Sequence, residues 1–201
     1  MKKLIITATI LMLCTFTYGQ LGLGIKAGLN LSGQTIKDTD IDISTKMKPG
    51  FHAGAYINYF IKKSSWGIQV EALYSMKGSE ITFKALSGEE NAKSKLYYID
   101  VPILLRWQII EFLNVHAGPQ FNILLSAENE FDDVTKDVKD QLKTAEFAFA
   151  FGAGVNLPFR LNVTARYIIG VSNIWDGSDD INASYKNNLL MLSLGFRIFG
   201  K

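Results

Sequence analysis

The feature that most constrains the fold is a strict two-residue alternation of apolar and polar side chains. In residues 97–109, YYIDVPILLRWQI, Asp100 and Arg106 fall on one phase, while apolar side chains such as Ile103 and Leu105 fall on the other. Successive side chains of a β-strand point to opposite faces, so this alternation predicts a strand with one polar and one apolar face. Similar stretches occur at residues 21–31, 50–62, 66–77, 97–109, 113–125, 145–157, 161–171 and 189–199.

The length and spacing of these eight stretches indicate a membrane barrel. Each has about 11 to 13 residues, whereas a strand in a globular protein has about 5–6 and a tilted strand that crosses a bilayer needs about 9–11. Short turns and long polar connections alternate, as in outer-membrane barrels. The short turns comprise Lys-Ser-Ser after residue 62, residues 110–112 and residues 158–160, and the long connections comprise residues 32–49, 78–96, 126–144 and 172–188.

Charge is confined to one face of the predicted strands. None of the apolar faces carries a charged residue, and a charge that faces lipid at mid-bilayer costs about 2–4 kcal/mol. The polar faces also hold many Gly and Ala residues, which fit a narrow barrel interior. Aromatic residues near strand ends fit interfacial girdles; these are Trp66, Tyr74, Tyr97 and Trp107.

The competing interpretation is a soluble β-sandwich or lipocalin-like barrel. Such a fold also alternates, but its polar face meets bulk water and usually carries abundant Lys, Glu and Asp, whereas the polar face here has few charges. The pattern therefore predicts an all-β fold, an eight-stranded antiparallel up-and-down transmembrane β-barrel. Pro102 lies on the interior phase and lacks a backbone donor, so we expect a bulge or a local break in pairing there.

The charged residues predicted inside the barrel are Lys26, Glu71, Asp100, Arg106, Glu146, Arg166 and Arg197. Buried charges are tolerated when they are paired and hydrogen-bonded. We therefore expect Glu71 and Asp100 to pair with Lys26, Arg106, Arg166 or Arg197 in a network that fills the lumen. A proton or ion pathway is the functional alternative. The interior of an eight-stranded barrel is only wide enough for side chains, which argues against a solute channel.

The N-terminal residues resemble a secretory signal peptide. Lys2 and Lys3 precede a short apolar run, and small residues follow before Gln20. We predict a signal peptide at residues 1–19 and a barrel domain at residues 20–201. A membrane anchor would need about 20 apolar residues, and a lipoprotein signal at Cys14 would need a small residue where Leu13 stands.

Removal of this segment changes the composition of the chain. It takes away the single cysteine and two of the 21 Lys and Arg residues, which leaves 19 basic residues against 19 acidic ones. A near-neutral mature chain gives no indication of nucleic-acid binding.

Few residues are candidates for catalysis or for metal binding. The two histidines, His52 and His116, lie on interior phases of different strands, and no GxSxG-like element accompanies them. We expect structural histidines, no catalytic or cofactor-binding residues and no zinc site. The connection 126–144 carries three aspartates that invite calcium, although the EF-hand spacing is absent; these are Asp132, Asp133 and Asp137.

The same connection contains a helical spacing of apolar residues. Val134, Val138 and Leu142 recur at every fourth position. This spacing predicts a short amphipathic helix that caps the connection.

Five segments that span the mature chain are GIKAGLNLS at 24–32, GIQVEALYSMKG at 67–78, YYIDVPILLRW at 97–107, HAGPQFNILL at 116–125 and GFRIFG at 195–200. These segments resemble the PorT-like outer-membrane β-barrel proteins of Bacteroidetes. The resemblance implies an eight-stranded barrel in the outer membrane. One member of that group is associated with protein secretion across the envelope, which is an analogy and no more for this chain.

Together these patterns predict a non-enzymatic integral outer-membrane protein with a plugged polar interior and external loops for structural, adhesive or partner-binding roles. The alternatives are an accessory component of an envelope protein-secretion or transport machinery and, less favoured, a lipid A-modifying enzyme. We expect a monomer in outer-membrane lipid, with no cofactor and with any protein partner bound through the external loops.

Overall fold

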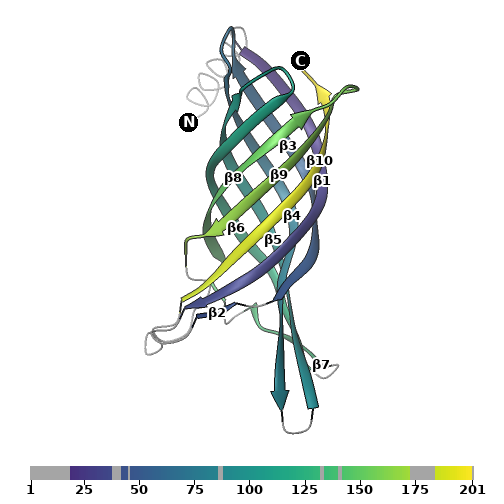
Figure 1. Ribbon diagram of the computed structural model, residues 1–201, viewed down its shortest axis with the longest axis vertical. Coiled ribbons are helices and arrows are strands. Elements are labelled where there is room, and N and C mark those ends of the chain that lie inside the picture. The colour runs from purple at the N-terminus through teal and green to yellow at the C-terminus, as the bar shows by residue number, and fades with distance from the viewer. Residues whose placement is uncertain are drawn as a thin grey trace, which may run out of the picture.

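The computed structural model describes residues 19–37, 42–44, 46–85, 88–131, 134–139, 142–172 and 184–200, which form a single closed wall of strands (Figure 1). The predicted signal peptide, apart from Gly19, lies outside the described residues. The strands are β1 (Gly19–Lys37), β2 (Asp42–Ser44), β3 (Lys46–Ile61), β4 (Trp66–Ala85), β5 (Gly88–Gln108), β6 (Leu113–Phe131), β7 (Val134–Asp137), β8 (Ala145–Asn156), β9 (Leu161–Gly170) and β10 (Ser184–Phe199).

The eight long strands close into a barrel because the last strand pairs with the first. The sheet order is β10-β9-β8-β6-β5-β4-β3-β1, and β10 also pairs antiparallel with β1, from Leu23 opposite Phe199 to Lys37 opposite Ser184. The short strands β2 and β7 add to β1 and β6 at one end. The predicted eight-stranded antiparallel up-and-down barrel is confirmed.

The two ends of the barrel differ, as the connection lengths predict. Tight turns at residues 62–65, 109–112 and 157–160 lie at one end, where β1 also begins and β10 ends. Phe159 and Arg160 both have positive φ values, 61° and 65°, and Leu161 N donates to Pro158 O, which describes a type I′ hairpin turn. In Figure 1 the start of β1 and the end of β10 lie at the top, with the short turns.

At the other end the strands run further than the sequence predicts. β4 and β5 stay paired from Lys77 opposite Leu96 to Ala85 opposite Gly88, so residues 78–85 and 88–96 form the two arms of a β4–β5 hairpin where we expected a loop. This hairpin projects beyond the barrel at the bottom of Figure 1. The prediction was wrong because beyond the bilayer no lipid sorts the two faces, so a strand continues without alternation.

The predicted amphipathic helix in residues 126–144 is also wrong. Val134–Asp137 form strand β7, which pairs with β6. Val138 and Leu142 instead pack on a cluster of buried side chains at this end of the lumen; it comprises Leu96, Tyr98, Leu124 and Ala127. Their four-residue spacing therefore reflects burial at the barrel mouth.

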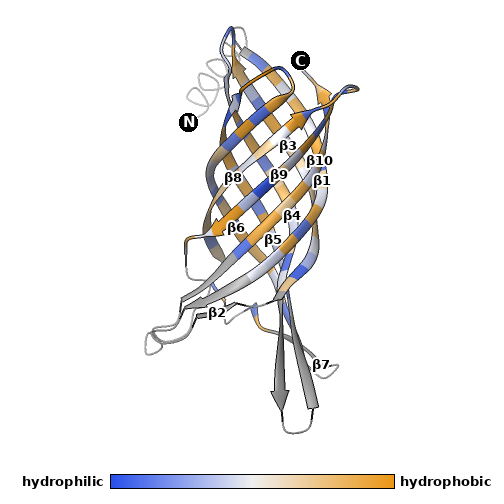
Figure 2. Ribbon diagram, in the orientation of Figure 1, coloured by the Kyte–Doolittle hydropathy of each residue, from blue (hydrophilic) through white to orange (hydrophobic). Residues whose placement is uncertain are grey.

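The outward face of the barrel is apolar over its whole circumference. Ile25, Leu29 and Leu192 are 52%, 66% and 54% exposed. Among strand residues whose side chains the structure describes, no Asp, Glu, Lys or Arg is exposed. Figure 2 shows the alternation of hydrophobic and hydrophilic residues along each barrel strand. Within the described ranges, no helix is long and apolar enough to cross a membrane.

Aromatic side chains mark two levels on the outer wall. Trp66 and Trp107 stack at the short-turn end with ring centroids 5.5 Å apart. Tyr74 stacks on Tyr97 at 6.1 Å and contacts Phe51 at 6.2 Å. The path along β4 from Trp66 to Tyr74 is eight residues, or roughly 26 Å of strand. Because barrel strands tilt by about 35–45°, this path corresponds to roughly 20 Å along the barrel axis, near the height of about 25 Å of the apolar band of a membrane barrel.

Pro102 produces the local break that the sequence predicts. The β4–β5 ladder pairs Val70 with Ile103 and Leu73 with Asp100, but no pair lies between them. The register is the same on both sides of the gap, so the break involves no bulge.

Candidate functional site in the barrel interior

A buried carboxylate, Glu71 of β4, is the centre of the interior polar network. It is 1% exposed. Arg166 of β9 donates two hydrogen bonds to it, Nη1 to Oε2 at 2.9 Å and Nη2 to Oε1 at 2.8 Å. Lys26 of β1 adds a third from Nζ to Oε1 at 2.7 Å. This bidentate geometry with a second cation offsets the cost of burying the carboxylate.

The network continues toward the short-turn end through neutral side chains. Gln69 Nε2 donates to Glu71 Oε1 at 2.5 Å, and Gln69 Oε1 accepts from Arg106 Nη1 at 2.7 Å. Arg106 Nη2 donates to Asn156 Oδ1 at 3.0 Å. These bonds connect β4, β5 and β8, so they tie together strands that do not all pair directly.

Asp100 does not join this network, and the predicted pairing with Lys26, Arg106, Arg166 or Arg197 is wrong for it. Its partner is Lys77 of β4, with Nζ 2.8 Å from Oδ1, and Lys77 also lies 4.4 Å from the ring centroid of Tyr98. Asp100 is six residues from Arg106 along β5, which is about 20 Å of strand. Asp100 and Arg106 share a face but lie at different heights along the barrel. Alternation does not give that height, so it did not identify Lys77 as the partner of Asp100.

Arg197 and Glu146, the remaining predicted interior charges, are not hydrogen-bonded to Glu71. Arg197 is half-buried near the end of β10 and hydrogen-bonds the side chain of Tyr56. Glu146 is 3% exposed in β8. The structure therefore brings together Lys26, Glu71, Arg106 and Arg166 and places the other three elsewhere on the inner wall.

Both histidines point into the barrel and have hydrogen-bond partners. His52 contacts Asn30 Oδ1 through Nδ1 and Ser193 Oγ through Nε2, each at 2.8 Å. His116 Nε2 accepts a bond from Arg166 Nε at 3.2 Å. Each ring is thus held by side chains of the interior.

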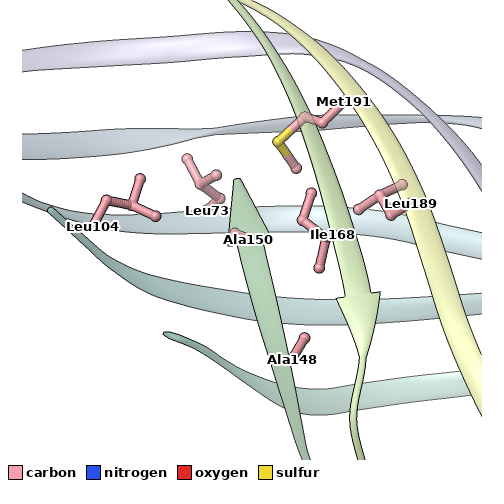
Figure 3. Close-up of a cluster of buried hydrophobic side chains, with 7 residues drawn as sticks. All are labelled: Leu73, Leu104, Ala148, Ala150, Ile168, Leu189 and Met191. Atoms are coloured by element: carbon pink, nitrogen blue, oxygen red, sulfur yellow. The ribbon is translucent and has the colours of Figure 1, made fainter. Parts of the chain in front are cut away.

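An apolar layer inside the lumen was missed by sequence reasoning. It comprises Leu73, Leu104, Ala148, Ala150, Ile168, Leu189 and Met191, all at most 2% exposed (Figure 3). On the inner face of β4, Leu73 lies between Glu71 and Lys77, so this layer separates the two groups of ion pairs. These residues fall on the inward phase, which also carries the charged residues. Alternation assigns a side chain to the inner face but does not show which inner side chains pack together.

The described residues hold no group of three or more His, Cys, Asp or Glu side chains placed to bind a metal ion. Asp132 and Asp133 lie outside the described residues, so calcium binding by that connection stays a prediction.

Comparisons with known proteins agree with the barrel. Residues 15–176 match the family model described as outer membrane protein beta-barrel domain. The crystal structure of Neisserial surface protein A is 12% identical and aligns over 87% of this chain and 96% of that protein with a TM-score of 0.53. This likeness concerns the fold alone.

Two further solved structures are similar. The attachment invasion locus protein Ail of Yersinia pestis is 16% identical, with 88% and 98% coverage and a TM-score of 0.48. The outer membrane protease OmpT of Escherichia coli is 8% identical, with 90% and 97% coverage and a TM-score of 0.40. The search of curated proteins gave no match. The chain belongs to the outer membrane protein beta-barrel domain family, and it is an eight-stranded barrel of the outer membrane.

Proposed function

We propose that this protein is a non-enzymatic, monomeric outer-membrane barrel whose lumen is closed and whose external segments perform its function. The observation that carries this proposal is the succession of side-chain layers in the interior. The Glu71 ion pairs, the apolar layer around Leu73 and Met191, and the Lys77–Asp100 pair follow one another along the inner wall. An ion that entered would lose its water at the apolar layer without gaining polar partners.

The external segments supply the candidate interaction surface. In outer-membrane barrels the short turns face the periplasm and the long connections face outward, so the β4–β5 hairpin projects from the cell. Its ladder reaches Ala85 opposite Gly88, whereas the β5–β6 ladder ends at Ala92 opposite Phe131. Within the described ranges, which stop at Phe131 and resume at Val134, the β5–β6 ladder pairs no residue of β5 between Gly88 and Asn91. Such strand edges bind partner strands in many recognition modes, which supports a structural, adhesive or partner-binding role.

A second candidate is an accessory component of an envelope protein-secretion or transport machinery. The resemblance of residues 97–107 to PorT-like proteins of Bacteroidetes favours it, and its partner would belong to the same envelope. A lipid A-modifying enzyme has less support, because the two histidines of the chain are buried, at 1% and 5% exposure for His52 and His116.

Conductance across planar bilayers tests the closed lumen. The purified protein is expected to give no stable open pore, and a persistent single-channel current would overturn the closed-lumen proposal. Mass spectrometry of lipid A from cells with and without the protein tests the enzyme alternative. Unchanged lipid A is expected, and a shift in mass that His116→Gln abolishes would replace the proposal with an enzyme.

Photocrosslinking distinguishes an external binding role from an accessory role in an envelope machinery. A photoreactive residue at position 84 is introduced into the full chain, and the same residue at position 110, which is exposed in the short β5–β6 turn at the opposite end, serves as the control. We expect crosslinks to a ligand outside the cell from position 84 and none to that ligand from position 110. A crosslinked envelope complex that co-purifies in mild detergent would favour the accessory role instead.

A further inference from the structure

The short-turn end of the barrel contains a cavity of about 490 Å³, within the roughly 300–1,000 Å³ of small-molecule sites. Its polar lining comes from β1, β3, the β3–β4 turn, β5, β8 and β10. The side chains that bear on its chemistry are Gln20, Asn58, Lys63, Arg106, Asn156 and Arg197. On the inner side, Arg106 bonds Gln69, which in turn bonds Glu71. These hydrogen-bonded side chains close the cavity on its inner side, and we call the cavity the vestibule.

The vestibule carries an excess of positive charge. Lys63, Arg106 and Arg197 line it, and the acidic residue of the lining is Glu111, which is exposed in the β5–β6 turn. Within the described part of the chain, neither Arg106 nor Arg197 forms an ion pair with a carboxylate. One level deeper, two cations share the carboxylate of Glu71. A recess lined by one sign of charge between low-dielectric walls concentrates the opposite sign.

Arg106 is the residue whose surroundings point to a ligand. Its side chain belongs to a residue that is 5% exposed, and it bonds the amide oxygens of Gln69 and Asn156. Its Nε has no hydrogen-bond partner among the described protein atoms. A buried donor without an acceptor costs about 1–3 kcal/mol, and more on a charged group. Nε itself is shielded from the cavity, so the ligand is inferred from the charge of the guanidinium group, which has no carboxylate partner among the described residues and which an anion in the vestibule would neutralise.

We propose that the vestibule binds a small oxyanion of the phosphate class, held by Arg106, Arg197 and Lys63. Guanidinium groups present planar pairs of donors that match phosphate oxygens. The amide groups of Asn58 and Gln20 provide neutral donors in the same lining. The phosphate comes either from a phospholipid headgroup of the adjoining leaflet or from a free phosphorylated solute. This site lies at the end of the barrel opposite the β4–β5 hairpin. A failure of phosphate binding would therefore not contradict the proposed external role, and a failure of the external role would not contradict the phosphate site.

Calorimetric titration of inorganic phosphate into the full-length protein in a maltoside detergent tests this site. The test variant combines Arg197→Gln with Lys63→Gln. Arg160→Gln is the matched control, because Arg160 lies exposed in a short turn at the same end and outside the lining. We expect the double variant to weaken phosphate binding at least tenfold and the control to change it less than twofold. Absence of binding by the wild-type protein, or an equal loss in the control, would overturn the proposal.

The folded state of each variant is checked by its heat-dependent mobility on SDS gels, so a loss of binding is interpreted only for folded protein. Repeating the titration in phosphatidylcholine nanodiscs assigns the source. If headgroups occupy the vestibule, the apparent affinity for added phosphate falls at least tenfold relative to detergent, and the double variant eliminates that difference. If the ligand is a free solute, the affinity is the same in both. Either result supports the oxyanion site.

Discussion

Glu71 and Arg166 form a strut across the barrel. In the closed order of eight strands, β4 and β9 are four places apart in either direction, so they lie on opposite sides of the lumen. Two hydrogen bonds of 2.9 and 2.8 Å nevertheless join their side chains. The strut fixes the distance between opposite walls, and Lys26 braces it from a third strand at 2.7 Å.

Removal of the carboxylate leaves two buried cations without a partner. We expect Glu71→Ala to lower the free energy of unfolding by about 3–5 kcal/mol, the range for breaking a buried ion pair. Urea unfolding in lipid vesicles, followed by tryptophan fluorescence, measures it. Glu111→Ala is the control, because Glu111 is exposed in a turn and its loss should have little effect. Equal stability of the two variants would refute the strut.

The Lys77–Asp100 pair gives a second test of the interior electrostatics. Lys77→Met and Asp100→Leu each leave a buried charge unpaired, whereas the double variant removes both. We expect the double variant to be more stable than the sum of the single effects implies, with an interaction energy of about 0.5–3 kcal/mol. The same unfolding measurement yields the double-mutant cycle. Simple additivity would show that the 2.8 Å contact contributes no coupling.

Glycines on the inner wall differ in how much room they have. A Cβ at Gly118 would collide with the carbonyl oxygen of Ile103 and lie 3.1 Å from Leu104 Cα, whereas the nearest atom to a Cβ at Gly195 is 3.5 Å away. We expect Gly118→Ala to destabilise the barrel by about 1–3 kcal/mol. Gly195→Ala should change stability by much less. A tolerated Gly118→Ala would mean that the β5–β6 wall yields more readily than its backbone contacts imply.

The free-energy cost of a charged side chain on the outer wall should depend on its depth in the membrane. Leu194 lies midway along the lipid-facing stripe of β10, and Ile198 lies near its short-turn end. We expect Leu194→Arg to cost about 2–4 kcal/mol and Ile198→Arg about 0–1 kcal/mol. Reversible unfolding in vesicles compares the two. Equal costs would indicate that β10 does not cross the bilayer from one position to the other.

Sequence patterns predicted the fold well where lipid sorts the side chains. Alternation at Ile25, Leu192 and their equivalents fixed the strands because lipid and lumen make opposite demands on adjacent residues. The same reasoning failed at the other end, where residues 78–85 and 88–96 continue as paired strands.

Inside the barrel, sequence reasoning assigned the face of each charge but not its partner. The pairing of Asp100 with Lys77 depends on the level at which tilted strands meet, which alternation does not encode. The apolar layer was missed for a related reason. Leu73 and Met191 fall on the phase shared with charged residues, and only the packing of five strands reveals that they meet.

The central claim is that lipid contacts the apolar outer face of the barrel and not its inner face. The most direct test measures lipid contact at individual side chains and needs no substitutions. Intermolecular NOEs between acyl-chain protons and methyl groups of the protein in nanodiscs report it. We predict strong NOEs at Ile25, Leu192 and Leu194 and none at Leu73, Ile168 or Met191. Acyl NOEs at Met191 and Leu73, with water contacts at Leu192 and Leu194, would contradict the account.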